Sequence, residues 1–274
     1  MTTKLAVVTD IHYGHTFRST LGGKADRLLK HFIKAANRYH PAAVVNIGDN
    51  ITAHNHDDSE KFMRHITSYF NQLAVPAYHV LGNWDVKYLD RAECAILTGS
   101  PATSYSRDVG DYHLLFLNPS HTDKHEKDRL LLQDSDIEWV RQDLAGTTKP
   151  TVVFSHVPLD DVSERIMREI PAGEQHKIIA NRFGFAEKGP ALRAAMEQSG
   201  KVVLCMSGHV HKNICREING IHYITQQSLS HLYQDRFKIA SRTFSFIELA
   251  ADKIKVRLKG KAPKTFTLIP RPMI

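Results

Sequence analysis

The sequence predicts a protein of the α/β class. Short apolar runs rich in β-branched residues, which are typical of buried strands, alternate with longer segments whose apolar residues recur at helical spacing. The 274 residues include no internal repeat, low-complexity tract or convincing linker. One domain over residues 1–274 is therefore the economical interpretation.

Composition narrows the class of protein. Apolar residues make up 42% and charged residues 24% of the chain, which is ordinary for a soluble globular protein. No apolar run approaches the roughly 18 residues that a membrane helix needs, and the N-terminus lacks a signal-peptide pattern. We therefore expect a cytoplasmic protein without membrane contact. Three cysteines without a Cys-x-x-Cys spacing argue against a disulfide framework and a thiolate metal site.

The formal net charge of +7 is compatible with phosphate-bearing partners. Apart from residues 253–264, however, the basic side chains are scattered and no aromatic residues are interleaved with them, which disfavours nucleic acid. The sequence leaves the oligomeric state open, a homo-oligomer included.

Three strands predicted in the first part of the chain, 5–9, 43–47 and 78–81, all end in polar residues. Between them lie a helix over 25–39, which stops before a proline, and a helix that begins after Ser59 as its N-cap. The residues that follow the three strands are Asp10 and His12, Gly48-Asp49-Asn50, and Gly82-Asn83-Trp84-Asp85.

Two later strands, 150–155 and 202–206, end in the same way. The first is followed by His156 and the second by Gly208-His209-Val210-His211, in which the i, i+2 spacing directs both imidazoles to the same side. The other expected elements are a strand over 112–117, a helix after the capping box Ser135-x-x-Glu138, loops with one short helix over 157–189, a helix over 190–198, and successive antiparallel strands over 214–218, 221–225, 243–249 and 254–258.

Five strand ends thus carry carboxylate, amide or imidazole side chains. In parallel and mixed sheets, ligands bind just past the carboxyl ends of strands, so we expect these side chains to share a site. Singly, the aspartates and the asparagine could be helix caps or turn formers, and His156 could be a core histidine. Together they suffice to ligate two metals of borderline softness if one carboxylate bridges them.

The order Asp-x-His, Gly-Asp-Asn, Gly-Asn-x-Asp, His and Gly-His-x-His, from Asp10 to His211, resembles the calcineurin-like metallophosphoesterase superfamily. The resemblance implies a four-layer αββα sandwich of two mixed β-sheets flanked by helices, with a dimetal site at the strand ends. It implies Mn, Fe, Zn, Ni or Co as divalent or trivalent ions. The implied ligands are Asp10, His12, Asp49 and His211 for the first ion, and Asp49, Asn83, His156 and His209 for the second.

In such a site two ions generate a metal-bound hydroxide and neutralise the phosphoryl group that it attacks. The resemblance implies catalytic roles for Asp49, Asn83 and His209, and replacing the bridging Asp49 should do most damage. The motif forms are most similar to the cyclic-nucleotide and glycerophosphodiester phosphodiesterase branch, so we expect a small organic phosphodiester as substrate. A phosphomonoesterase, a nucleotide pyrophosphatase and a metal-binding protein with little catalysis are the alternatives.

One position departs from the family pattern. Many members have histidine where this chain has Trp84, and an indole cannot act as a general acid. Either another histidine near a motif, such as His15 or His54, substitutes for it, or the leaving group needs little protonation. The candidates for substrate binding are Asn50, His15, His54 and Trp84; the alternative for the two histidines is an exposed loop position, and for the indole simple packing.

Overall fold

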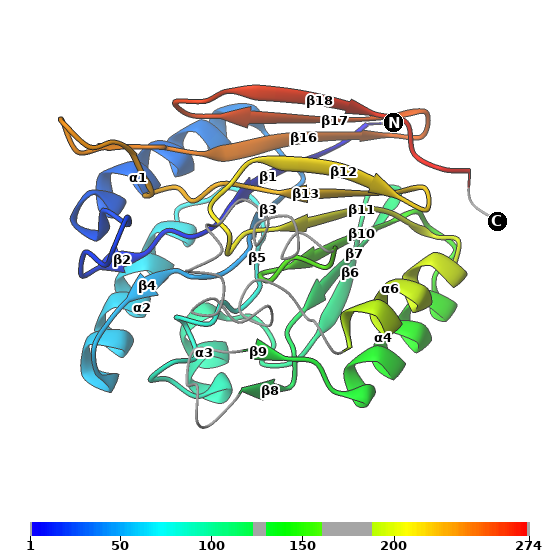
Figure 1. The fold of residues 1–274 in the computed structure, drawn as a ribbon, viewed down its shortest axis with the longest axis horizontal. Helices are drawn as coiled ribbons and strands as arrows, with labels where there is room; N and C mark the ends of the chain where they lie inside the picture. Colours follow the sequence, from blue (N-terminus) through cyan, green and yellow to red (C-terminus); the bar gives the residue numbers. More distant parts are fainter. Residues whose placement is uncertain (1, 123–129, 161–187, 273–274) are drawn as a thin grey trace, which may run out of the picture.

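The computed structural model describes residues 2–122, 130–160 and 188–272, and its centre is a pair of six-stranded β-sheets (Figure 1). The first sheet has the order β18 (Lys264–Leu268), β17 (Lys253–Lys259), β16 (Phe244–Ala250), β1 (Thr3–Val8), β3 (Ala43–Asn46), β5 (Ala77–His79). The second has the order β12 (Ile214–Ile218), β13 (Ile221–Thr225), β11 (Val202–Ser207), β10 (Thr151–Ser155), β7 (Tyr112–Leu117), β6 (Tyr105–Val109). Both sheets are mixed, as the sequence predicted.

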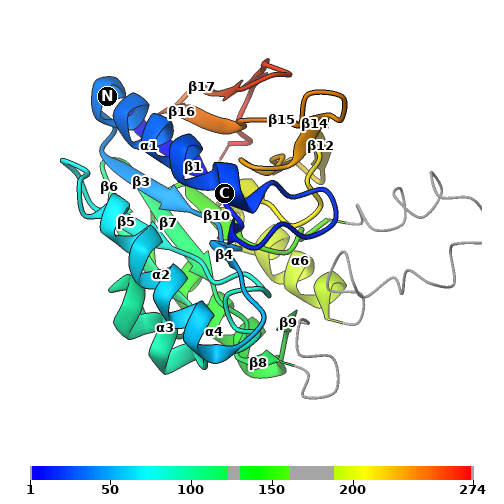
Figure 2. The ribbon, with the colours of Figure 1, turned by 90° about the vertical axis from the view of Figure 1, so that its left-hand side faces the viewer.

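Helices cover the outer faces of both sheets (Figures 1 and 2). They are α1 (Gly22–Tyr39) and α2 (His56–Phe70) on the first sheet, α4 (Asp134–Gly146) and α6 (Gly189–Gln198) on the second, and α3 (Arg91–Thr98) beside α2. Alternate residues of β1 face opposite layers: Leu5 and Val7 belong to the core between the sheets, whereas Ala6 and Val8 belong to the core beneath the helices. The predicted four-layer αββα sandwich is confirmed.

Strand direction places the polar strand ends together. In the first sheet β1, β3 and β5 are parallel neighbours, and in the second β10 and β11 are parallel neighbours. Because parallel neighbours end at the same edge, the segments after all five strands emerge on one side of the molecule. Two short pairs extend this edge: β2 (Tyr13–Gly14) with β4 (Ile51–Thr52), and β14 (Leu232–Gln234) with β15 (Ile239–Ala240).

Two helix starts differ from the predictions. Helix α2 begins at His56, because the side chain of Asn55 accepts the hydrogen bond from the Asp58 backbone N–H and so caps it; Ser59 is buried inside the helix. The capping box of α4 is formed by Gln133 and Asp136, two residues before the predicted pair.

Other elements were not predicted. Helix α3 has a capping box between Asp90 and Glu93, but it is too short to show a clear apolar period. The C-terminal strands were expected to follow one another as antiparallel neighbours, yet the hairpin β12–β13 belongs to the second sheet and the hairpin β16–β17 to the first. Strand β18 extends the first sheet beyond β17. A third short pair is β8 (His121–Thr122) with β9 (Leu130–Leu131). The short helix expected within 157–189 falls largely outside the described residues. Across those residues no helix is both long and apolar enough to cross a membrane.

Candidate metal centre

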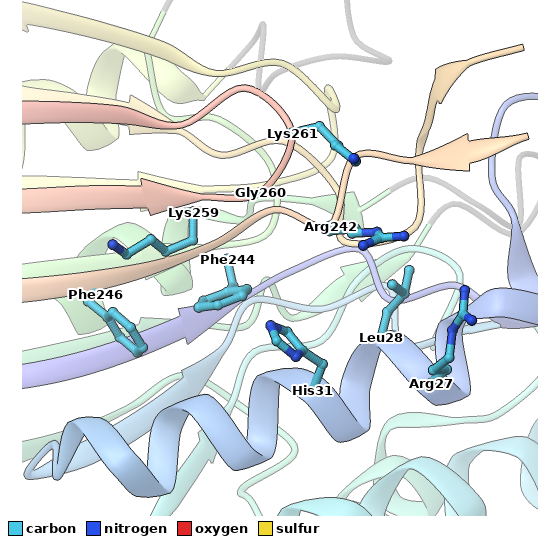
Figure 3. A pocket seen from close by; sticks show the side chains of 9 residues that line it. All are labelled: Arg27, Leu28, His31, Arg242, Phe244, Phe246, Lys259, Gly260 and Lys261. Carbon is cyan, nitrogen blue, oxygen red and sulfur yellow. The ribbon is translucent and has the colours of Figure 1, made fainter. Parts of the chain in front are cut away.

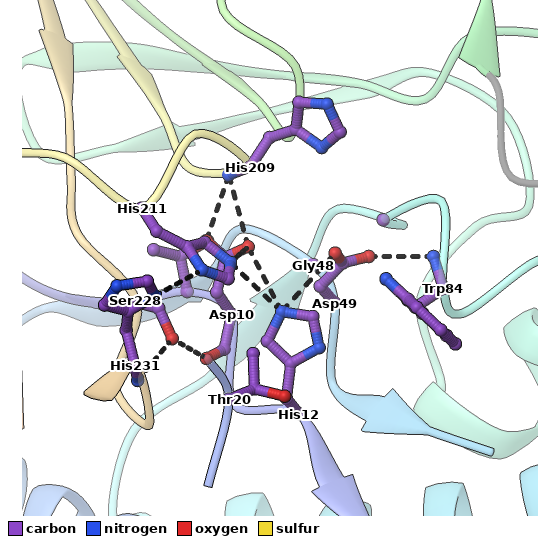
Figure 4. A network of polar contacts seen from close by, with 12 residues as sticks. Asp10, His12, Thr20, Gly48, Asp49, Trp84, His209, His211, Ser228 and His231 are labelled. Atoms are coloured by element: carbon purple, nitrogen blue, oxygen red, sulfur yellow. Dashed lines mark hydrogen bonds and ion pairs between the residues drawn. The ribbon is translucent and has the colours of Figure 1, made fainter. Parts of the chain in front are cut away.

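The loops after β1, β3, β10 and β11 bring six of the predicted side chains into two adjoining clusters, of which Figure 4 shows the first together with Asp49 and His209. Within each cluster, ligand atoms from the three residues lie within 4.8 Å of one another. The clusters are Asp10 with His12 and His211, and Asp49 with His156 and His209.

In the first cluster, His12 and His211 approach through their Nε2 atoms, which are 3.1 Å apart. The Nε2 of His211 is also 3.0 Å from Asp10 Oδ1, and that of His12 is 3.7 Å from the same oxygen. Three potential ligand atoms therefore converge on one point. The other carboxylate oxygen of Asp10 accepts hydrogen bonds from Thr9 Oγ1 at 2.7 Å and from the His209 backbone N–H at 3.0 Å, which fix its orientation.

The second cluster converges on His156, whose Nε2 lies 3.3 Å from Asp49 Oδ2, 3.2 Å from Asn83 Oδ1 and 3.3 Å from His209 Nδ1. His156, Asp49 and Asn83 are buried, and His209 is partly exposed. A single hydroxyl or amide hydrogen-bond donor could satisfy one of these atoms. A carboxylate, an amide oxygen and two imidazoles together are the ligands that suit a divalent cation.

One oxygen of Asp49 faces both clusters. Its Oδ2 is 3.3 Å from His156 Nε2 and 3.7 Å from His12 Nε2, whereas its Oδ1 accepts a hydrogen bond of 2.8 Å from the Trp84 backbone N–H. The Trp84 backbone thus fixes one oxygen and leaves the other between the clusters, which is the position of a bridging ligand.

Partners outside the clusters orient two of the imidazoles. The Nδ1 of His156 lies 2.7 Å from the backbone carbonyl of Ile47, and that of His12 lies 3.0 Å from Thr52 Oγ1. A carbonyl oxygen can only accept, so Nδ1 of His156 carries a proton, and Nε2 is the nitrogen that could bind a cation after losing its own proton. Such outer partners are typical of metal-binding histidines, and the donor set therefore fits two metal ions.

The electrostatics of the clusters favour ionised carboxylates. Burial opposes ionisation of Asp10, yet the neighbouring His211 and His12 hold the pKa of that carboxyl well below its ordinary value. Burial likewise opposes ionisation of Asp49, but His156 and His12 lower its pKa. In return, and against its own burial, His156 has a pKa raised to about 9 by Asp49 and Asp10. Protons therefore compete with a cation for His156 Nε2.

Asp85 connects two of the loops. It is fully buried, and its carboxylate accepts hydrogen bonds from the backbone N–H of Asn50 at 2.8 Å, from the side-chain amide of Asn50 at 3.1 Å and from the backbone N–H of Gly82 at 2.9 Å. Burial and the charge of Asp49 raise the pKa of Asp85 to about 7. The side chain of Asn50 is consequently held inside the protein.

A cavity of about 240 Å³ opens beside the clusters. Its residues are His12, Phe17, Arg18, Ser19, Thr20, Asp49, Asn83, Trp84, Lys87, His209, Val210, His211 and His231. The rings of Phe17 and Trp84 meet edge to face with centroids 4.9 Å apart, and the ammonium of Lys87 lies 4.2 Å from the indole centroid. One face of Trp84 is therefore covered by a cation from its own chain.

Two of the histidines considered for substrate binding lie elsewhere. His15 and His54 stack on each other with centroids 4.4 Å apart, and His15 Nε2 is 3.2 Å from Asp58 Oδ2. Neither residue lines the cavity. Among the four substrate-binding candidates, the structure brings Trp84 alone to the cavity.

Several residues that line the cavity were not predicted from the sequence. His231 lies with its Nδ1 3.0 Å from His211 Nδ1 and 3.2 Å from Ser19 Oγ. Burial and the charge of His211 lower the pKa of His231 to about 4. Nothing local distinguishes His231 among the 17 histidines of the chain, whereas Lys87 could have been considered because it lies two residues after the Gly82-Asn83-Trp84-Asp85 motif.

Known proteins resemble the chain in both sequence and fold. A family model described as calcineurin-like phosphoesterase matches residues 3–213, whereas no curated protein matches the sequence. Among solved structures, a dimetal phosphatase from Danio rerio has a TM-score of 0.76 at 14% identity, with 98% of this chain and 99% of that chain covered. GAP50, the anchor in the inner membrane complex of Plasmodium, has a TM-score of 0.61 at 15% identity, with 99% and 90% covered. The purple acid phosphatase PPD1 from yellow lupin has a TM-score of 0.60 at 14% identity, with 98% and 54% covered.

At these identities the solved structures show a shared fold. The family model spans more than half of the chain and includes every residue of the two clusters. The chain therefore belongs to the calcineurin-like phosphoesterase family.

Proposed function

We propose that the chain, as one domain over residues 1–274, is a dimetal-dependent phosphoesterase that hydrolyses a small organic phosphodiester. The observation that carries the proposal is the position of Asp49, whose Oδ2 faces imidazole nitrogens of both clusters at 3.3 and 3.7 Å. A carboxylate shared between two ligand clusters is the arrangement that binuclear hydrolases require.

The cluster residues would hold the two ions. We assign Asp10, His12, Asp49 and His211 to one, and Asp49, Asn83, His156 and His209 to the other. When bound, two such ions supply positive charge opposite a phosphoryl group and lower the pKa of a water molecule. The mixed nitrogen and oxygen donors accept Mn, Fe, Zn, Ni or Co.

Residues of the chain itself position the substrate. Asp49, Asn83 and His209 line the cavity and would face the phosphoryl group, while Phe17 and Trp84 form an apolar wall beside them. A diester carries an organic group on both sides of phosphorus, so one such group can lie against this wall. The Nδ1 of His231 lies 3.0 Å from Nδ1 of His211 and would orient that imidazole.

A specific observation favours a nucleotide pyrophosphatase as the second candidate. Arg18 and Lys87 both line the cavity that contains the cluster residues. Two cations beside the reacting phosphoryl group could bind a second phosphoryl group of a diphosphate-linked substrate.

The proposal is tested by hydrolysis of bis(p-nitrophenyl) phosphate, p-nitrophenyl phosphate and a nucleoside diphosphate sugar by metal-stripped protein reloaded with Mn. We expect the diester to be hydrolysed faster than the monoester, and Asp49→Ala to lose the activity because it removes a ligand of both ions. A faster monoester would assign a phosphatase, and preference for the sugar nucleotide a pyrophosphatase. No turnover of any substrate by protein with two bound ions would contradict a phosphoesterase.

A further inference from the structure

A second cavity, of about 610 Å³, shares no lining residue with the cavity at the metal clusters. It lies between α1 and the ends of β16 and β17 (Figure 3). Its residues are Arg27, Leu28, His31, Arg242, Phe244, Phe246, Lys259, Gly260 and Lys261. We call it the α1–β17 cavity.

The polar lining of the α1–β17 cavity is entirely basic. Arg27, Arg242, Lys259 and Lys261 line it together with His31, and none of its residues is acidic. Within residues 2–122, 130–160 and 188–272, these five side chains take part in no ion pair. Four positive charges around one cavity favour a bound anion.

The other part of the lining is aromatic and apolar. Phe244 is 5% exposed, and the Phe246 ring meets it edge to face with centroids 5.5 Å apart. The His31 ring lies 6.2 Å from Phe244 at 60°. In Figure 3 the head groups of Arg27, Arg242 and Lys261 lie toward one end of the cavity, and the Phe246 ring lies toward the other. The cavity therefore has three cations at one end, and the Phe246 ring together with the Lys259 ammonium at the other.

The backbone is fixed near two of these three cations. Gly260 has φ +121°, and a Cβ there would lie 2.7 Å from the carbonyl oxygen of Ser241 and 2.9 Å from that of Arg242. The next residue, Lys261, donates its backbone N–H to Ser241 O at 2.8 Å. The close approach that Gly260 permits holds the backbones of Arg242 and Lys261 beside each other, so both exposed side chains start from fixed positions at the rim of the cavity.

We propose that the α1–β17 cavity binds a phosphorylated ligand that carries a planar ring, of the nucleoside diphosphate or triphosphate class. The phosphoryl groups lie between Arg27, Arg242 and Lys261, and the ring lies against Phe244 and Phe246. The volume suits a ligand of this size and exceeds what a lone phosphate fills. The site is separate from the proposed phosphoesterase centre and adds a binding function to it.

The test is isothermal titration calorimetry of full-length, Mn-loaded protein with adenylyl imidodiphosphate, a triphosphate whose β–γ bridge resists hydrolysis, with the nucleotide checked for cleavage at its α–β bridge after each titration. The double variant Arg27→Ala/Lys261→Ala removes one cation from α1 and one just after β17. The matched control, Lys34→Ala/Lys253→Ala, removes exposed cations from α1 and the other end of β17. We expect the first variant to lose at least about tenfold in affinity and the control to stay within about twofold.

Hydrolysis of bis(p-nitrophenyl) phosphate should be the same in both double variants and in the parent protein. Because hydrolysis tests the phosphoesterase proposal and calorimetry tests the α1–β17 cavity, the failure of one proposal can be told from the failure of the other. Adenosine and inorganic tripolyphosphate should each bind more weakly than the whole nucleotide. Equal losses of nucleotide affinity in the two double variants would show an effect of net charge alone and would overturn the proposed binding site. Equal binding of tripolyphosphate would remove the ring from the proposal, and tighter, steeply salt-dependent binding of an oligonucleotide would replace it with a nucleic-acid surface.

Discussion

At the scale of single residues, the most unusual feature is the backbone of the candidate ligands. Asp10, His12, Asp49, His209 and His211 have φ angles of 53°, 49°, 52°, 65° and 56°. A non-glycine residue in this left-handed region is uncommon and costs of the order of 1 kcal/mol. Such strain persists only where surrounding contacts impose it.

Those contacts connect the strand ends to one another. The Asp10 backbone N–H donates to Gly48 O at 2.9 Å, and the His12 backbone N–H donates to Asp49 O at 3.0 Å. Ser228 Oγ donates to the carbonyl of Asp10 at 2.7 Å. The fold thus holds the ligands in conformations that they would leave in an isolated loop, which prepares the site before metals bind.

Lys87 provides a residue-scale test of the substrate cavity. Its ammonium lies 4.2 Å from the Trp84 indole centroid and lines the cavity. Lys87→Met keeps an apolar chain over the indole but removes the charge, so we expect KM for bis(p-nitrophenyl) phosphate to rise by about tenfold with little change in kcat. Lys34→Met, on the exposed side of α1, is the control. Equal KM values for Lys87→Met and the parent protein would exclude Lys87 from substrate binding.

At the scale of elements, the site depends on how closely the ends of β1 and β11 approach. A Cβ on Gly208, which follows β11, would lie 2.1 Å from Thr9 Oγ1 and 2.3 Å from Asp10 Oδ2. Gly82, after β5, is equally restricted, because its Cβ would lie 2.2 Å from the backbone nitrogen of Asp49. These glycines are required by the close approach of the loops.

Gly208→Ala therefore tests the contact between the two sheets. We expect this variant to displace Asp10, to bind Mn at least about tenfold more weakly and to unfold at lower temperature. Gly23→Ala is the matched control, because no atom lies within 4 Å of the added Cβ and the change should stabilise α1 by about 0.4–1 kcal/mol. Normal Mn affinity in Gly208→Ala would show that the close approach is not needed for the site.

How much of this the sequence predicts depends on whether the signal is local. The candidate ligands are indicated by the sequence because each follows a strand with a recognisable apolar run; they are Asp10, His12, Asp49, Asn83, His156, His209 and His211. The left-handed backbone and the cavity wall could not be found in this way. Phe17 and His231 reach the cavity from irregular segments, and only the tertiary fold brings them to Trp84 and His211. Nor does the sequence show that His15 and His54 stack on each other outside the cavity lining.

At the scale of the whole molecule, we expect His79 and His113, which lie outside the candidate metal clusters, to change the free energy of unfolding with pH in opposite directions. Burial lowers the pKa of His79 to about 4, whereas the pKa of histidine in the unfolded chain is about 6.5. The contribution of His79 to the free energy of unfolding is therefore complete above about pH 6.5 and is lost as the pH falls toward 4. Hydrogen bonds to Asp143 and Asp108 raise the pKa of His113, so its contribution is complete below about pH 6.5 and is lost as pH rises through the folded pKa.

Chemical denaturation of the parent protein, His79→Gln and His113→Gln from pH 4 to 8 measures both effects. The free-energy difference between parent and His79→Gln should shrink by about 3 kcal/mol from pH 7 to 4. The free-energy difference between the parent protein and His113→Gln should instead shrink as the pH rises above 6.5. Two pH-independent differences would show that neither histidine changes its pKa on folding.

We infer that one chain binds two metal ions with Asp49 between them. Anomalous diffraction from crystals of Mn-loaded protein tests it most directly. We expect two peaks, one among Asp10, His12 and His211 and one among Asn83, His156 and His209, with the Asp49 carboxylate in contact with both. No peak in either cluster, or one ion with Asp49 outside its ligands, would contradict the account.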